Sequence, residues 1–168
     1  ALAIWTVFIA LLFLPCLVAS PALAQRIGQP WAKGTLWLAK HLCRIDYRIE
    51  GAEHIRRDPV IYALKHQSAL EITIIMSMFP APAFVLKRSL LFLPFFGMYL
   101  WRMQMIAINR KGGAAEMKSM LAQCERAVRH LRPIAIFPEG TRIPAGEKGR
   151  YHPGVAAIYQ HLKIPVVP

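Results

Sequence analysis

Residues 60–71, with the sequence VIYALKHQSALE, contain the pattern that decides the fold. The first five are continuously apolar, which is typical of a short strand covered on both faces of a sheet. The remaining seven are polar at first and continue into a helix-like run, and Ser68 with Glu71 three residues later matches a helix capping box. A strand that leads directly into a helix predicts an α/β fold, in which ligands bind near the loops that follow the strands.

The rest of the chain continues this alternation of short strand-like runs and longer helix-like runs. A helical spacing of apolar residues predicts helices at 68–79 and 114–131. We therefore predict an α/β fold with a mixed, mostly parallel sheet flanked by helices. The expected strands are 45–50, 60–64, 83–86, 105–108, 134–137 and 164–167.

His66 and Glu71 form the first candidate chemical pair. Five residues along a regular helix is a rotation of about 140° off the same face, so the two side chains meet only if His66 precedes the helix. A histidine that takes a proton from a hydroxyl needs such an acid to fix its tautomer. Glu71 could equally serve only as a helix cap. His41 and Asp46 have the same spacing but lie in a helix end and a strand-like run, and we interpret them as a chance pair.

A second polar loop follows the strand-like run 134–137. Its residues are Pro138, Glu139, Gly140, Thr141 and Arg142. Proline and glycine shape a tight turn whose backbone can approach a ligand closely, and the arginine can bind an oxyanion. Alone, this segment would fit a surface turn with a solvated arginine. Two such loops after two strands favour a shared site.

Composition limits the kind of protein this is. The 168 residues carry a net charge of +12, yet 55% are hydrophobic and only 18% are charged. This combination argues against a disordered basic tail and favours a protein at a membrane surface. The basic residues are scattered and lack the aromatic-interleaved stripe of a nucleic-acid groove, so we expect no nucleic-acid partner. The three cysteines are far apart and match no zinc or disulfide pattern, and we expect no metal and no cofactor.

Residues 1–25 contain no charged side chain and include a long apolar run. Pro15 and Pro21 interrupt it, so we expect a hydrophobic membrane helix that is kinked or a helical hairpin that enters and returns. The alternative is a signal peptide, because Ala22-Leu23-Ala24 resembles a cleavage site. Basic residues after the segment predict that the rest of the chain lies on the cytoplasmic side. They are Arg26, Lys33, Lys40 and Arg44.

KHQSALE at 65–71 and FPEGTR at 137–142 together resemble the glycerolipid acyltransferase family, particularly its bacterial members that acylate 1-acylglycerol 3-phosphate. Further motifs follow in the family's order, which is stronger support than any single motif. They are Lys87-Arg88-Ser89-Leu90, Pro94, Gly97, Ile108-Asn109-Arg110 and the apolar run 164–168. The resemblance covers about residues 45–168. Glu71 stands where the family usually has Asp, and Ser89 where it usually has Glu, so no role is assigned to Ser89.

The resemblance implies a role for each matching residue. His66 would be the base that activates an sn-2 hydroxyl for attack on an acyl thioester, and Glu71 would orient it. The substrate-binding residues would be Lys87, Arg110, Glu139, Gly140, Thr141 and Arg142. Among these, the three cations would hold the acceptor's phosphate, as a dianion requires.

The implied function is acyl transfer from acyl-CoA or acyl carrier protein to lysophosphatidic acid, forming phosphatidic acid in phospholipid biosynthesis. Another lysophospholipid or a lyso-aminolipid could be the acceptor, and a non-catalytic basic membrane-binding protein is a further alternative. We expect an anchor at 1–44 and a catalytic domain at 45–168 that faces the cytoplasm from the inner membrane. We also expect the chain to be a fragment, cut within the last strand.

For three segments, the sequence leaves alternative interpretations open. The helix expected at 30–43 could lie in a membrane interface or pack on a protein core. The apolar run 90–105 is short for a membrane span and could form a core helix, or else line an acyl-chain tunnel or touch the bilayer. The basic stretch 147–152 could meet an acidic carrier protein or anionic lipid, or remain a mobile charged loop.

Overall fold

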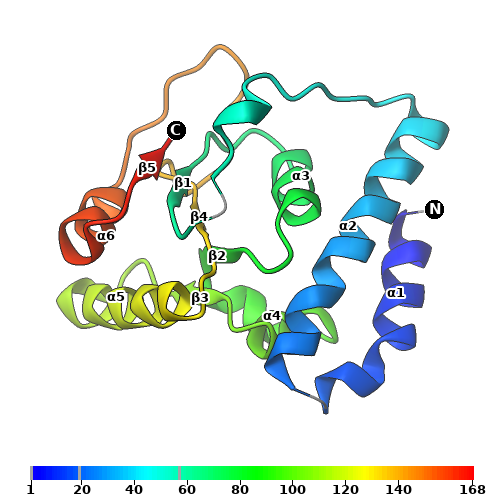
Figure 1. The fold of residues 1–168 in the computed structure, drawn as a ribbon, viewed down its shortest axis with the longest axis horizontal. Coiled ribbons are helices and arrows are strands. Elements are labelled where there is room, and N and C mark those ends of the chain that lie inside the picture. The colour runs from blue at the N-terminus through cyan, green and yellow to red at the C-terminus, as the bar shows by residue number, and fades with distance from the viewer. Residues whose placement is uncertain (1, 19, 57) are drawn as a thin grey trace.

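The computed structural model describes residues 2–18, 20–56 and 58–168. At its centre is a five-stranded sheet with the order β3-β2-β4-β1-β5 (Figure 1). Every strand pair recorded in the described residues is parallel, so the sheet is all-parallel where a mixed one was predicted. The strands are β1 Ile61–Ala63, β2 Ala83–Lys87, β3 Ile106–Ile108, β4 Ile134–Ile136 and β5 Val166–Val167.

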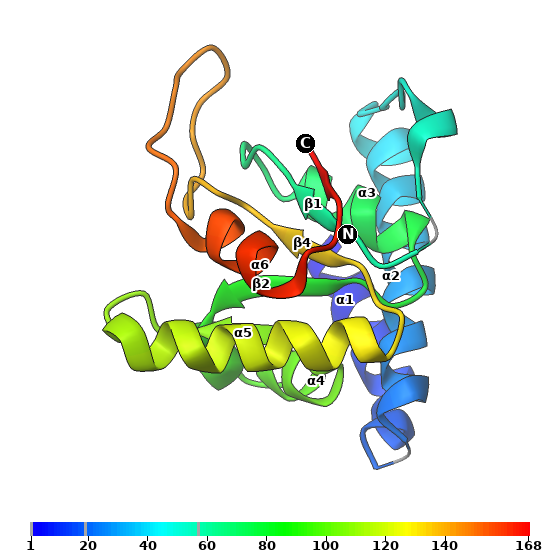
Figure 2. The same cartoon turned by 60° about the vertical axis from the view of Figure 1, so that its left-hand side comes forward.

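Helices cover both faces of this sheet. Figure 2 shows α5 and α6 on one side, with α2 and α1 on the other. The α-helices are α1 Leu2–Leu12, α2 Pro21–Cys43, α3 Leu70–Met78, α4 Phe96–Arg102, α5 Gly113–Arg129 and α6 Gly154–Leu162. Short 3-10 helices lie at η1 Leu14–Leu17, η2 Ala52–His54 and η3 Arg88–Phe92.

Alternation along the strands separates two apolar cores. Tyr62 and Phe84 point to one face, where they are buried with residues of α2, α3 and α4. Ile61 and Ile134 point to the other face, where they pack with residues of α5 and α6. Burial on both faces explains why the strand sequences are continuously apolar.

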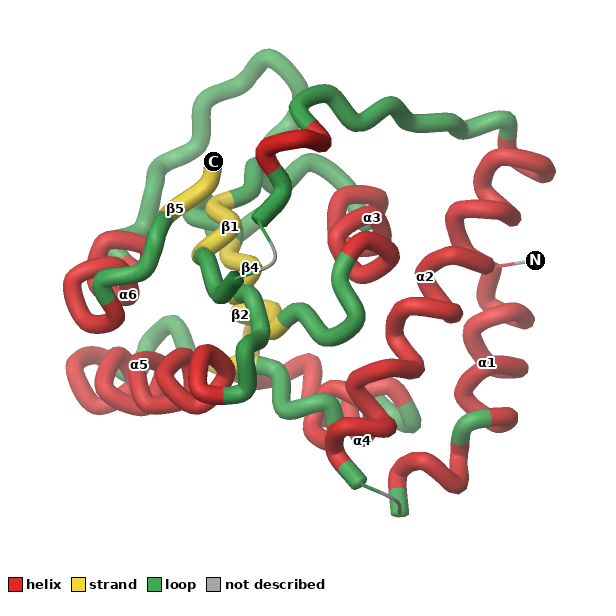
Figure 3. The backbone as a smooth tube through the Cα atoms, viewed as in Figure 1, coloured by secondary structure: helices red, strands yellow, loops and turns green. Residues whose placement is uncertain are grey.

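Five of the six expected strands and both expected helices are confirmed, with small shifts at their ends. The strand expected at 45–50 is wrong. Ile45, Tyr47 and Ile49 alternate as a strand would, but this segment is an exposed connection without strand pairing that crosses from α2 to η2 (Figure 3). An alternating pattern of apolar residues forms a strand only where a neighbouring strand is available for pairing.

The N-terminal segment forms a helical hairpin. α1 ends before η1, which contains Pro15, and α2 begins at Pro21 with Ser20 as its cap. Two tryptophan hydrogen bonds join the arms: Trp5 Nε1 donates to Trp31 O at 3.3 Å, and Trp31 Nε1 donates to the Thr6 hydroxyl at 3.4 Å. No helix within residues 2–18, 20–56 and 58–168 is both long and apolar enough to cross a membrane. Positions 1 and 19 of the predicted anchor lie outside the described residues.

The helix expected at 30–43 is the second half of α2. Ala32, Thr35 and Leu36 are buried, whereas Trp37 and Leu42 are exposed. Gln29 also donates to the carbonyl of Ser77 in α3 at 3.0 Å. One stripe of this helix therefore packs on the protein core, and the far end presents apolar side chains outward.

Candidate active site

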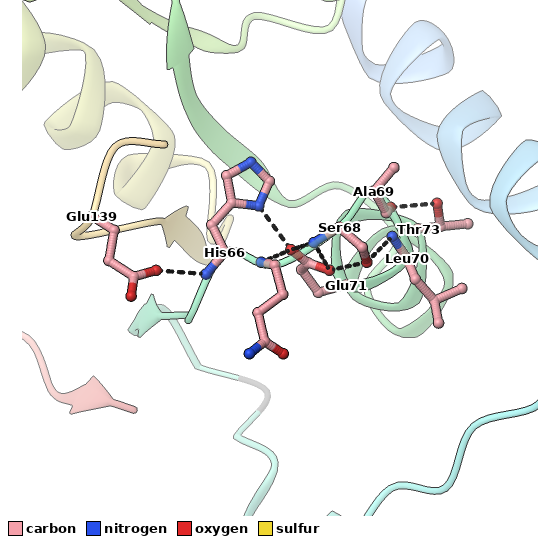
Figure 4. A network of polar contacts seen from close by, with 8 residues as sticks. His66, Ser68, Ala69, Leu70, Glu71, Thr73 and Glu139 are labelled. Carbon is pink, nitrogen blue, oxygen red and sulfur yellow. Dashed lines mark hydrogen bonds and ion pairs between the residues drawn. The ribbon is translucent and has the colours of Figure 1, made fainter. Parts of the chain in front are cut away.

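The loop after β1 carries His66, and neighbouring backbone holds it in place. The His66 amide donates to Glu139 Oε2 at 2.9 Å, and its carbonyl accepts from the Ile143 amide at 2.8 Å. Glu139 and Ile143 belong to the loop after β4, which is the strand beside β1. The two motif-bearing loops are therefore joined at His66, as their positions after parallel strands predicted (Figure 4).

The imidazole of His66 is fixed on two sides. Its Nδ1 lies 2.7 Å from Glu71 Oε1, and its ring stacks on Phe137 with 4.2 Å between centroids. Since an ionised carboxylate can only accept, Nδ1 carries the proton of the neutral ring and Nε2 keeps a lone pair. The side chain is 15% exposed and lines a cavity. His66 is thus arranged as a base.

Glu71 contacts both the ring of His66 and the backbone that leads into α3. Besides His66, its carboxylate accepts from the amides of Gln67 and Ser68 at 2.8 and 2.9 Å and from the Ser68 hydroxyl at 2.6 Å. Burial raises the pKa of this carboxyl, but the hydrogen bonds from Ser68 and His66 outweigh burial and lower it to about 2. The helix cap lies at Ala69, one residue beyond the predicted Ser68, whose hydroxyl accepts from the Leu70 amide.

Glu139 contacts the backbone of His66, whereas Gly140 lines the cavity next to it. Glu139 is only 4% exposed and does not line the cavity; its carboxylate accepts from the backbone of His66. Gly140 does line the cavity and has φ of +65°, a conformation that L side chains rarely adopt. The positive φ explains the glycine of the motif, while Glu139 holds the backbone of His66.

Two of the three predicted phosphate ligands face the same cavity. Lys87 ends β2 and Arg110 follows β3, and both line the cavity with His66. Glu116 joins these two loops, because its Oε1 accepts from Arg88 at 2.7 Å and from the Asn109 amide at 2.8 Å. Within the described residues, the side chains of Lys87 and Arg110 have no recorded ion-pair or hydrogen-bond partner. They are available to an anion.

Thr141 and Arg142 lie apart from this group. Both side chains are exposed, and neither lines the cavity. Their predicted contacts with substrate stay predictions. In this conformation, the loop between Gly140 and His152 extends away from the sheet (Figure 2).

The cavity has a volume of about 880 Å³ and continues from His66 into an apolar region. Its walls include Ile9 of α1, Ile27 of α2, Met76 of α3 and Leu100 of α4. The run 90–105 therefore lines the cavity, and it also exposes Phe92 and Trp101 at 80% and 67%. No sequence pattern predicted that α1 and α2 would supply walls, because their contacts with 90–105 join distant parts of the chain.

The other histidine and acid pair does not form. Asp46 pairs with Lys40 at 2.7 Å, while His41 stacks on Trp37 and lies 2.8 Å from its carbonyl. This agrees with the interpretation of His41 and Asp46 as a chance pair. The described part of the chain holds no group of three or more His, Cys, Asp or Glu side chains placed to bind a metal.

An α/β sheet with a histidine and carboxylate pair at the carboxyl ends of its strands defines a class of protein equipped for base chemistry. A family model described as "Acyltransferase" matches residues 46–168. The chain belongs to this Acyltransferase family.

Individual relatives and a solved structure agree with this assignment. A 1-acyl-sn-glycerol-3-phosphate acyltransferase of Pseudomonas aeruginosa is 35% identical over 142 residues, covering 84% of this chain and 55% of the relative. One from Borreliella burgdorferi is 36% identical over 121 residues, covering 68% and 45%. The crystal structure of the 1-acyl-sn-glycerophosphate (LPA) acyltransferase PlsC from Thermotoga maritima has the same fold, with a TM-score of 0.62 at 20% identity over 99% of this chain and 71% of that chain. This chain spans about half the length of the curated relatives it matches.

Proposed function

We propose that this protein transfers a fatty acyl group from an acyl thioester to the sn-2 hydroxyl of lysophosphatidic acid, forming phosphatidic acid. The observation that carries the proposal is the hydrogen bond between His66 Nδ1 and Glu71, which leaves Nε2 free at a cavity. That cavity has unpaired cations near the histidine and apolar walls beyond it. The names of the relatives point to the same reaction.

The reaction needs one proton to move twice. Nε2 of His66 takes the proton of the acceptor hydroxyl as its oxygen attacks the thioester carbonyl. The tetrahedral intermediate then expels the thiolate, which leaves with the proton from the imidazolium. Glu71 stabilises the imidazolium between these steps and holds the ring in one orientation. No acyl-enzyme is required.

We assign the acceptor's phosphate to the cations of the cavity and an acyl chain to its apolar walls. Lys87 and Arg110 would bind the acceptor's phosphate, and Arg142 is expected to join them if its loop moves inward. The apolar region among α1, α2 and α4 would take an acyl chain. Acyl-CoA or acyl carrier protein would be the donor, and the basic stretch 147–152 remains a candidate contact for an acidic carrier.

Association with a lipid bilayer is supported by one apolar surface. Phe8 and Leu11 of α1, together with Phe95 and Trp101 near α4, are exposed on elements that pack around η1. We propose that this surface enters the cytoplasmic leaflet of the inner membrane, with the site facing the cytoplasm. Arg26, Lys33 and Lys40 of α2 would meet anionic head groups.

The test is thiol release from acyl-CoA and acyl carrier protein thioesters in detergent, with lysophosphatidic acid as acceptor and the full-length protein. His66→Ala should reduce turnover about 10²- to 10⁴-fold, the usual contribution of a general base. His41→Ala is the matched control and should leave turnover unchanged. Undiminished turnover in His66→Ala would contradict the mechanism, whereas no thiol release from the wild type with any acceptor would favour a non-catalytic binder. Turnover with a lysophospholipid or lyso-aminolipid in place of lysophosphatidic acid would identify a different acceptor.

A further inference from the structure

His152 lies at the site although no motif includes it. The atoms nearest to a Cβ built on Gly140 are His152 Cδ2 at 3.2 Å, His152 Nε2 at 3.5 Å and Arg110 Cζ at 3.6 Å. The imidazole edge and the guanidinium therefore approach the same point, where Gly140 has no side chain. Both residues line the cavity that His66 opens onto.

The position of His152 is set by its backbone. Its amide donates to the carbonyl of Pro138 at 2.8 Å, which closes the long loop that begins after Gly140. The loop carries Arg142 outward and returns His152 to the cavity. The nearby carboxylates are already engaged: Glu139 accepts from the His66 amide, and Glu116 accepts from Arg88. In the described residues, no hydrogen bond or ion pair is recorded for the His152 side chain.

We propose that His152 is a ligand of the acceptor's phosphate, with its Nε2 donating to the same phosphate group that Arg110 binds. The inference rests on the proposed function and adds a residue to its acceptor site. A phosphomonoester presents several strong acceptor oxygens, which a fork-shaped guanidinium satisfies only on one side. Imidazole Nε2 supplies a further donor on another side, in either the neutral tautomer protonated there or the charged form. Gly140 makes room for both donors.

Direct binding of sn-glycerol 3-phosphate, measured by calorimetry on the full-length protein, tests the inference without turnover. His152→Ala should weaken binding about tenfold, as expected for the loss of one hydrogen bond to a charged group. His152→Gln places an amide nitrogen near the position of Nε2 and should restore binding to within about threefold of wild type. His130→Ala is the control, because His130 is exposed just beyond α5.

A double-mutant cycle with Arg110 tests whether the two residues bind the same phosphate or whether His152→Ala only perturbs the local structure. Combining His152→Ala with Arg110→Ala should weaken binding by less than the product of the single effects, because both residues contact one group. In acyl-transfer assays, His152→Ala should raise the KM for lysophosphatidic acid about tenfold and leave kcat within about twofold.

The outcomes distinguish this inference from the proposed function. If wild type binds sn-glycerol 3-phosphate and His152→Ala binds it equally well, the inference is wrong. It is also wrong if wild type does not bind this probe, or if His152→Gln is as weak as His152→Ala. If binding behaves as expected but lysophosphatidic acid gives no turnover, the proposed function fails while the phosphate site stands.

Discussion

The sheet has one hydrogen-bonded charge at the carboxyl ends of its strands (the carboxyl edge) and another at their amino ends (the amino edge), and the two charges have different roles. At the carboxyl edge, Glu71 is held by His66 and Ser68 next to a cavity. At the amino edge, Arg132 is only 4% exposed and precedes β4. Within the described residues, the hydrogen bonds of its side chain go to backbone carbonyls of the segments that lead into β2 and β3. They are Ala81 at 2.8 Å, Pro82 at 3.3 Å, Met103 at 3.1 Å and Gln104 at 3.2 Å.

The two networks differ in whether a hydrogen-bonding position remains free for a ligand. Burial lowers the pKa of Arg132 to about 10, and its Nε, Nη1 and Nη2 atoms all donate to carbonyls. At the carboxyl edge, Glu71 fixes only one nitrogen of His66, and the other faces the cavity. A saturated buried charge stabilises the fold, whereas a fixed group with a free bonding position can act on a ligand. Four substitutions or conditions test this contrast.

Glu71→Gln should have the largest effect. The amide can donate to Nδ1, which would shift the proton of His66 to Nε2 and remove the base, so we expect a loss of about 10³-fold or more in turnover. Glu147→Gln is the control, because Glu147 is exposed and, in the described residues, only its backbone makes hydrogen bonds, with Lys65 and Pro144. Steady-state assays of thiol release measure both. Near-normal turnover in Glu71→Gln would reduce Glu71 to a helix cap.

Arg132→Met should act on stability and leave the chemistry intact. The variant leaves four carbonyls without their donor, two of them in buried contacts and two in partly buried ones, and we expect the free energy of unfolding to fall by roughly 3 kcal/mol. Arg129→Met is the matched control, because Arg129 is exposed and bonds only Glu125, so it should change stability by less than about 0.5 kcal/mol. Urea unfolding measures both. If Arg132→Met lost turnover without losing stability, Arg132 would act on the chemistry, and the proposed difference between Arg132 and Glu71 would be wrong.

The carboxyl edge was more predictable from sequence than the amino edge. The loops with His66 and Glu139 follow apolar strands directly, so local pattern placed both near one edge of a parallel sheet. Arg132 has no such signal, because its partners are carbonyls whose positions depend on the folded chain. The walls from α1 and α2 were missed for the same reason: they reach the site from far along the chain. The stretch 147–152, which contains His152, was expected to contact a carrier or lipid or to stay a mobile loop, because the sequence does not show that this loop returns to the cavity. The strand expected at 45–50 failed because periodicity does not show whether a pairing edge exists.

Glu116→Gln should have a moderate effect on acceptor binding. Its carboxylate holds the loops of Lys87 and Arg110 together through Arg88 and the Asn109 amide. A neutral amide retains part of this bonding, so we expect the KM for lysophosphatidic acid to rise about five- to tenfold with little change in kcat. Because Arg88→Met breaks the same contact, the double variant should be little worse than either single one. Additive effects would show that Glu116 does not act through Arg88.

The pH dependence of stability should give the smallest effect. The pKa of the Glu71 carboxyl is lowered from 4.5 to about 2 by the hydrogen bonds that outweigh its burial. A carboxyl with a lowered pKa in the folded state contributes stability that is present above pH 4.5 and lost as the pH falls towards 2. The excess urea midpoint of wild type over Glu71→Gln should therefore be constant from pH 6 to about 5 and shrink below 4.5.

Other carboxyl groups with lowered pKa, such as Asp46 and Asp58, occur in both proteins and cancel in this difference. Repeating the comparison in a His66→Ala background removes the imidazole from both proteins. The loss below pH 4.5 should persist there with a smaller amplitude, because the bonds from Ser68 remain after the bond from His66 is removed. A midpoint difference that is constant down to pH 2.5 would mean that the fold does not hold Glu71 as a carboxylate. The carboxyl edge would then have no fixed charge to compare with Arg132 at the amino edge.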